Sequence, residues 1–344
     1  MPAASAGNIL FSKVVAFKET TPGTSAISTS GGRKSLTSAT GIISLNQEWD
    51  LGEDRSVALR NPIVAGGSTL ISSEPEVSLE VPAISVGELP VWFSGMDAAT
   101  ITGASAPYTW DFKPVMTNTS NSPTSYSLQV GDGQQAYAVT YVLPTELSIK
   151  ADRSGLTSLS VSAFAQAVAK DSTATTEGVP TSPFLSGRLW KPYVYTNAAA
   201  FAADITTSTI PTGGTAYNYV LDFDLKINTG LTKQAYLAGT TAFVTHAESA
   251  AIGGDVSLTV QSNASAVTTW YDAIGSAKYL RLEHNGAGTY PVNIQVAFIV
   301  TDVQVIAGDE DGLTTYSVTG TLAYDATSAA TLRVILKSDL AALP

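Results

Sequence analysis

The feature that most constrains the fold is an internal repeat, because segments of the second half of the chain resemble segments of the first half in the same order. Residues 155–162 (GLTSLSVS) correspond to residues 312–319 (GLTTYSVT), 157 positions later. Residues 78–81 (SLEV) correspond to residues 257–260 (SLTV), 179 positions later. Colinear self-similarity of this kind is typical of a duplicated structural unit. The sequence therefore predicts two diverged copies of one domain.

The spacing between matching segments sets the boundaries of the two copies. Because the offset falls from 179 to 157 along the chain, the first copy must hold extra residues. We expect them at residues 103–125, which are rich in loop-forming residues. Residues 171–187 are polar and contain prolines, which is typical of a linker. We therefore expect a first domain over residues 1–170 and a second domain over residues 188–344.

Short runs of alternating polar and apolar residues predict strands in both copies. In each copy such a run precedes a short helix candidate, residues 86–96 and residues 264–274, which carry Trp92 and Trp270. Both tryptophans lie on apolar helical faces at matched repeat positions, so we expect them in the core. Charged residues make up only 14% of the chain and hydrophobic residues 44%, a composition that favours strands rich in Val and Thr. The expected fold class is all-β, with two tandem β-sandwich or barrel domains that each have one short flanking helix.

The pattern also makes local predictions about single elements. Residues 137–143 and 146–150 are expected as separate strands, and so are residues 292–300 and 302–307. Residues 20–40, which are dominated by Ser, Thr and Gly, are too long for a hairpin turn. We expect this stretch to be disordered in the free subunit, or to form an arm that a neighbouring subunit orders.

Residue patterns typical of catalytic or metal-binding sites are missing from the sequence. The chain has no Cys and two His, His246 and His284, and neither His has metal-ligand spacing to another donor. A Ser–His–Asp arrangement stays open, although no Gly-x-Ser-x-Gly precedes a helix. Residues 309–312 (DEDG) look like part of a calcium loop but lack its alternating ligands. We expect no enzymatic activity, no cofactor and no metal.

The formal net charge of −11 bears on the partners of the chain. Specific binding to nucleic acid needs clustered Lys and Arg, so we do not expect it. Asp222 and Asp224 alternate on one expected strand and share a face; they are candidates for lining an enclosed space or for a solvated acidic surface. The sequence has no apolar stretch of bilayer-spanning length, and Met1–Gly7 does not resemble a signal peptide, so we expect no membrane partner and synthesis in the cytoplasm.

Three segments carry a resemblance to a known family: residues 14–24 (VVAFKETTPGT), residues 77–81 with 87–93 (VSLEV, GELPVWF), and residues 316–322 with 333–336 (YSVTGTL, RVIL). They resemble the major tail tube proteins of long-tailed bacteriophages of the siphophage type. The resemblance implies a sandwich with a flanking helix whose sheets pack edge to edge into a ring. Rings of this kind stack through long loops or arms into a tube.

For a chain with two such domains, the resemblance implies a homotrimeric ring with pseudo-sixfold symmetry, located in the virion tail and in contact with other tail proteins. DNA would pass through an acidic conduit during genome ejection without specific binding. Replacing Asp222 and Asp224 with Lys is then expected to slow ejection. A capsid decoration or fibre domain, or a bacterial surface adhesin of sandwich type, fits the composition equally well. An enzyme that acts on polysaccharide is a third reading, supported only by the β architecture and scattered carboxylates.

Overall fold

The chain folds mainly into β-strands, with few and short helices, which confirms the all-β expectation. The structure, a computed structural model, describes residues 13–27, 34–36, 39–53, 63, 67–117, 119–132, 134–171, 182–206, 210–285, 289–310 and 312–344. Within these ranges, no helix has the length and apolar character that crossing a bilayer requires.

The described residues of the first half form one short helix among their strands. The strands are β1 (Lys13–Lys18), β2 (Lys34–Leu36), β3 (Thr40–Ser44), β4 (Gln47–Asp50), β5 (Thr69–Ser73), β6 (Glu76–Val81), β7 (Thr100–Thr102), β8 (Tyr108–Phe112), β9 (Tyr126–Gly131), β10 (Ala136–Asp152), β11 (Ser158–Phe164) and β12 (Ala167–Asp171), and the helix is α1 (Leu89–Phe93).

The second half contains two short α-helices. Its strands are β13 (Trp190–Val194), β14 (Thr215–Ala216), β15 (Val220–Asn228), β16 (Leu231–Gln234), β17 (Thr245–Glu248), β18 (Gly253–Gln261), β19 (Ala277–His284), β20 (Val292–Glu310), β21 (Leu313–Leu322) and β22 (Leu332–Ser338), and its helices are α2 (Ala198–Ile205) and α3 (Ala264–Thr269).

The two halves pair their strands in the same order. In the first half β1 pairs with β9 and β9 with β10, while β10 also pairs with β11, β11 with β6, and β6 with β3. In the second half β13, β19, β20, β21, β18 and β15 follow the same sequence of pairings. The register agrees as well, since Leu79 lies opposite Val161 and Leu258 lies opposite Val318. Each of these six strands of one half therefore has a counterpart in the other.

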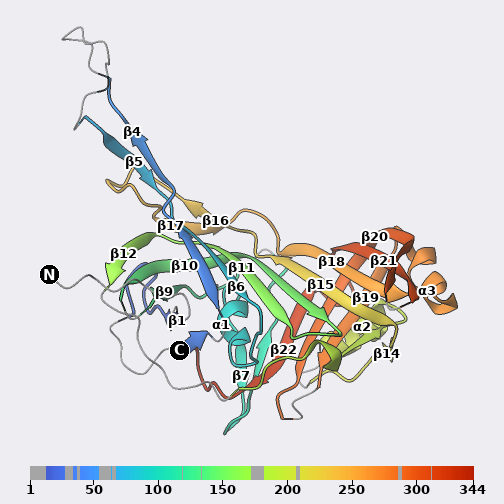
Figure 1. The fold of residues 1–344 in the computed structure, drawn as a ribbon. Helices are drawn as coiled ribbons and strands as arrows, with labels where there is room; N and C mark the ends of the chain where they lie inside the picture. Colours follow the sequence, from blue (N-terminus) through green and yellow to red (C-terminus); the bar gives the residue numbers. More distant parts are fainter. Residues whose placement is uncertain are drawn as a thin grey trace.

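Strands of both halves join in one antiparallel sheet with the order β3-β6-β11-β10-β15-β18-β21-β20. The junction between the halves is the pair β10·β15, and the long central strands cross the body in Figure 1. Strands β10 and β20 also belong to two further series, β2-β1-β9-β10-β12 and β14-β13-β19-β20-β22-β8-β7. Strands β4-β5 and β16-β17 form separate two-stranded sheets. Because both halves share a sheet, the domain boundaries given above stay a prediction.

Strands β10 and β20 correct the expectation of separate short strands. Each is one long strand that pairs with different neighbours along its length. In β10 the residue Tyr141 has a positive φ of 54°, and the register shifts between Val139 and Val142, so an irregularity bends the strand without ending it. In β20 the register shifts between Val300 and Asp302. The prediction of separate strands was wrong because alternation of polar and apolar residues is interrupted at each irregularity, as it would be at a strand end.

The core lies on the inner face of the eight-stranded sheet. Val77, Leu79 and Val81 of β6 are buried while the residues between them are exposed, as alternation in a half-buried strand requires. Trp92 in α1 and Trp270 at the end of α3 are both buried. Trp92 lies in the helix that follows β6, and Trp270 directly follows the helix after β18. Strands β6 and β18 are counterparts in the repeat.

The expected insertion at residues 103–125 is only partly a loop. It contains β8, which pairs with β22 of the second half. There the guanidinium of Arg333, 2% exposed, donates two hydrogen bonds of 2.8 Å to the carboxylate of Asp111. Arg333 also donates to the backbone oxygen of Ile205 at 3.0 Å. The extra residues of the first copy thus bind the two halves together.

Two further expectations concern connecting segments. Of the expected linker at residues 171–187, residues 172–181 lie outside the described residues, but Leu185 is buried and its amide donates to the oxygen of Ile84 at 3.0 Å. The end of this segment is therefore part of the core rather than a free linker. Within residues 20–40, Lys34–Leu36 pairs with β1, while residues 28–33 and 37–38 lie outside the described residues. The expectation for this stretch therefore stays a prediction. Among the described residues, the β4–β5 hairpin projects from the body (Figure 1).

Two ion pairs that join the halves should differ in their contribution to stability. We expect Asp111→Asn to lower the free energy of unfolding by about 3 kcal/mol, because it leaves the charge of buried Arg333 without its partner. Lys150→Met breaks the pair of Lys150 with Asp224, where the Lys150 side chain is 58% exposed, so it should cost under about 1 kcal/mol. Urea unfolding of both variants measures the difference; equal losses would contradict it.

Candidate functional site: a polar sheet face and two open edges

The solvent side of the eight-stranded sheet carries an almost continuous layer of polar side chains, which we call the polar sheet face. In β15, Asp222, Asp224 and Lys226 point to this side while the residues between them are more buried. Cross-strand register assigns its other members: Ser44, Glu76, Ser78, Glu80, Glu146, Ser148, Lys150, Asp152, Ser158, Ser160, Ser162, Asp255, Ser257, Thr259, Asp302, Gln304, Ser317, Thr319 and Thr321. Hydroxyl groups dominate this set, and its carboxylates outnumber Lys150 and Lys226.

The candidates Asp222 and Asp224 both lie on the polar sheet face, in different surroundings. Asp224 accepts a hydrogen bond of 2.8 Å from Ser148 Oγ and pairs with Lys150 Nζ at 2.9 Å. Partial burial is the main cause that raises the pKa of Asp222, and a side-chain hydrogen bond with Thr259 opposes this shift. Asp224 therefore joins β15 to β10 through its contacts with Ser148 and Lys150. For Asp222, partial burial favours the uncharged form of the carboxyl group.

The junction β10·β15 shows how two copies of the repeat bind each other. Leu147 lies opposite Ile227, and Lys150 lies opposite Asp224, in a regular antiparallel register from Glu146 to Asp152. Lys226 Nζ pairs diagonally with Glu146 Oε2 at 2.8 Å, which raises the pKa of Lys226. Backbone hydrogen bonds, a buried apolar row and two cross-strand ion pairs together make this contact.

The two strands of this junction, β10 and β15, have the repeat counterparts β20 and β3. In the described part of the chain, both counterparts lie at open sheet edges. The end of β20, Asp302–Glu310, corresponds to the end of β10, and β3 corresponds to β15. In the described part of the chain, β3 pairs only with β6, and β20 beyond Thr301 pairs only with β21. An unpaired strand edge presents free N–H and C=O groups that can template pairing with another strand. The molecule therefore has two open edges that correspond to the two sides of the internal junction.

Each of these open edges carries exposed apolar side chains. Ile42 on β3 is 73% exposed, and Ile306 in the irregular part of β20 is 76% exposed; Val305 beside it is 48% exposed. At the counterpart of Ile42 the internal junction has Asp224. Large exposed apolar groups on an edge strand favour contact with another chain.

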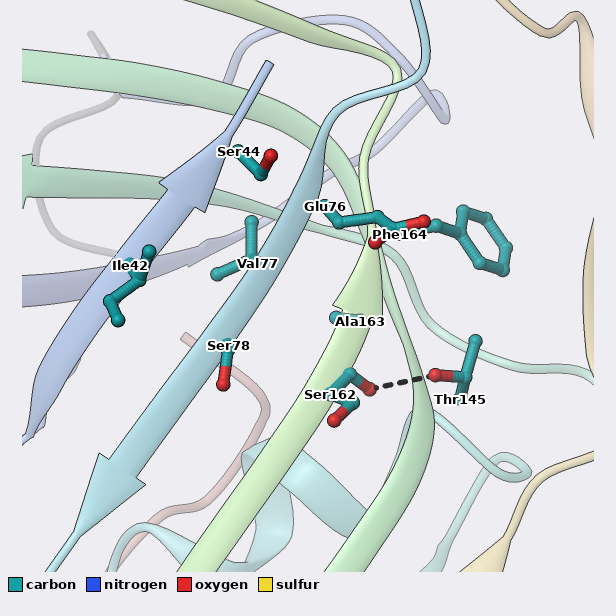
Figure 2. Close-up of a pocket in the computed structure, with 9 residues that line it drawn as sticks. All are labelled: Ile42, Ser44, Glu76, Val77, Ser78, Thr145, Ser162, Ala163 and Phe164. Atoms are coloured by element: carbon teal, nitrogen blue, oxygen red, sulfur yellow. Dashed lines mark hydrogen bonds between the residues drawn. The ribbon is translucent and has the colours of Figure 1, made fainter. Parts of the chain in front are cut away.

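A shallow depression of about 320 Å³ lies on the polar sheet face close to the β3 edge. Figure 2 shows Ser78, Ser162 and Thr145 around it, with Ile42 on one side and Phe164 on the other; the Thr145 hydroxyl donates to the Ser162 oxygen at 3.1 Å. Glu76 is the one ionisable side chain in its lining. A single carboxylate without an acid or base partner offers no hydrolytic mechanism.

Neither histidine lines this depression. His246 Nδ1 is 3.0 Å from the hydroxyl of Tyr141, and partial burial is the main cause that lowers its pKa. His284 is buried beside the ring of Trp190. Within the part of the chain that the structure describes, no group of three or more His, Cys, Asp or Glu could hold a metal ion.

Sequence reasoning missed the open-edge residues, although a signal was available. Ser44 and Ile42 become visible as counterparts of Lys226 and Asp224 once the repeat is aligned through Leu79 and Leu258. Comparison with known proteins adds no function for them, because no protein family matches the chain and no curated protein has a significantly similar sequence.

His284 should make the stability of the protein depend on pH. Burial lowers its pKa below the ordinary value of 6.5, and a backbone hydrogen bond with Ser186 opposes this only partly. Below pH 6.5 the unfolded chain binds a proton that the folded chain excludes, so the free energy of unfolding should fall as the pH falls. We expect His284→Phe to flatten this dependence between about pH 7.5 and about pH 5, measured by urea unfolding. Parallel curves for wild type and variant would refute this role.

Proposed function

We propose that this protein is a structural subunit that assembles head to tail, through its two open sheet edges, into closed rings that stack as the tail tube of a long-tailed bacteriophage. The observation that carries the proposal is the internal junction β10·β15, whose two sides recur as the unpaired edges β20 and β3. Pairing β20 of one copy with β3 of the next would continue the same sheet. A contact between two different surfaces repeats from copy to copy and closes into a ring when the rotation allows it.

The register of this contact follows from the repeat. Glu146 lies opposite Asn228 and Leu147 opposite Ile227 in the internal junction, so Asp302 would lie opposite Asn46 of the next copy, and Val303 opposite its Leu45. Three chains would place six repeats in one ring, with pseudo-sixfold symmetry. The sheet would then have no open edge, which removes the aggregation hazard of an edge strand.

The polar sheet face supports the assignment of a conduit. In a ring closed by edge pairing, one face of the continuous sheet must face inward. We assign the polar sheet face, with Asp222 and Asp224, to the lumen, because its hydroxyls and excess carboxylates offer duplex DNA no cluster of cations. A negative lining surrounded by protein concentrates its field in the channel and repels phosphates. DNA could then move through without being held.

Substitutions at Ser44 test the edge contact with matched variants. In the internal junction Lys226 pairs with Glu146, and the counterparts are Ser44 and Asp302, so Ser44→Lys should add an ion pair between copies. We expect it to raise the association constant about two- to fivefold per junction at low salt. Ser44→Glu would place two carboxylates together and should lower association at least about tenfold. Light scattering at several protein concentrations measures both effects.

Both variants change an exposed residue and lose the same hydrogen bond to Asn46. Because Ser44 lies opposite Glu76 within the chain, the new charge also acts on folding, so urea unfolding of each variant separates that effect from association. The gain of Ser44→Lys should disappear in about 1 M salt, where charges are screened within about 3 Å. Identical association of the Lys and Glu variants would rule out this edge as the contact.

A further inference from the structure

Each half of the chain carries a hairpin arm at the same place in the repeat. The first arm, β4–β5, lies between β3 and β6, and the second arm, β16–β17, lies between β15 and β18. Figure 1 shows the first arm projecting away from the sandwich. The second arm contacts the first half of the chain, so the two arms differ in what covers them.

Aromatic packing fixes the second arm to the first half. Phe243 is fully buried in a cluster with Tyr141, Leu143, Phe164 and Leu231. Its ring centroid lies 5.2 Å from that of Tyr141 and 5.3 Å from that of Phe164. Burial of several aromatic rings in one cluster makes a substantial contribution to docking.

Polar contacts surround this cluster. Gln166 Nε2 donates a hydrogen bond of 2.8 Å to the oxygen of Phe243, and the amide of Ser73 donates to the oxygen of Thr241 at 2.8 Å. Lys233 Nζ pairs with Glu74 Oε2 at 2.6 Å. The second arm is therefore held on the neighbouring repeat by apolar and polar contacts together.

Comparable cover is absent from the described part of the first arm. Trp49 is 48% exposed, and Leu51 and Ile71 are each 53% exposed. An isolated two-stranded hairpin is at best marginally stable in water, and clustered exposed apolar residues mark contact sites. The first arm therefore has the exposed apolar residues expected of a docking element, but no described part of its own chain covers them.

We propose that the first arm docks on the second half of a neighbouring copy of this chain, as the second arm docks on the first half within the chain. The inference rests on the proposed head-to-tail assembly, which brings these parts together. Along the repeat, Leu143 corresponds to Ile299, which is 41% exposed, and Phe164 corresponds to exposed Thr321. Tyr324, 52% exposed, follows on the same acceptor surface.

Side-chain sizes at the counterpart positions support this partner. Counting from Asn228 and its counterpart Asn46, Leu231 of the second arm corresponds to Trp49 of the first arm. Trp49 is larger than Leu231. On the surface that would receive the first arm, Thr321 is smaller than its counterpart Phe164, which receives the second arm. A larger donor against a smaller acceptor conserves the packed volume that a close contact needs.

Cysteine crosslinking tests the arm contact directly, because the natural chain contains no Cys. We expect the variant Trp49→Cys with Ile299→Cys, treated with a short bismaleimide, to give covalent dimers and larger species on a denaturing gel. Each single variant should give none. The pair Lys233→Cys with Glu74→Cys is the matched control, since these side chains are in contact within one chain and should crosslink without forming dimers.

A second pair, Ser44→Cys with Gln304→Cys, reports on the sheet edges independently of the arm. Crosslinks between copies at both pairs would support the arm contact. Crosslinking at the edges without crosslinking at Trp49 and Ile299 would overturn the arm contact and leave the ring intact. Absence of both in assembled or concentrated protein would overturn the proposed assembly and the arm contact with it.

Discussion

Edge-to-edge pairing of β10 with β15 is the interaction on which the rest of the structure depends. It makes one eight-stranded sheet from two four-stranded units, and it fixes the register at which the apolar rows of both halves meet. Backbone hydrogen bonds of this kind have no sequence specificity of their own, so specificity must come from side chains across the junction. The β10·β15 junction meets this requirement inside the chain. The two outer edges of the sheet, β3 and β20, also need specific side chains if they are to pair with a particular partner.

The two junctions would use different chemistry. The internal one has Lys150 with Asp224 and Lys226 with Glu146, whereas the open edges offer Ile42, Val305 and Ile306. This difference provides a physical reason why β20 should select β3 of another copy and not β15, because pairing with β15 would bury lysine or carboxylate against isoleucine. The internal contact forms at high effective concentration and can rely on weak surface ion pairs. A contact between chains must gain more from apolar burial.

The sequence predicted the all-β class and the burial of Trp92 and Trp270, since both depend on alternation and on the repeat. It placed Asp222 and Asp224 on one face of one strand for the same reason. It did not predict that β10 and β20 continue through an irregularity, because a positive φ at Tyr141 has no signature in that residue type. Nor could it show that β8 pairs with β22 through Arg333 and Asp111, since partners this distant in sequence become neighbours only in the folded chain.

The most direct test of the central claim is a high-resolution image of the assembled protein. The account predicts a closed ring in which Val303 of each copy lies opposite Leu45 of the next, the sheet continues without a gap, and Asp222 faces the enclosed space. A stable monomer with both edges bare at high concentration would contradict it. So would a twofold dimer that pairs β3 with β3, because such a contact cannot continue from copy to copy.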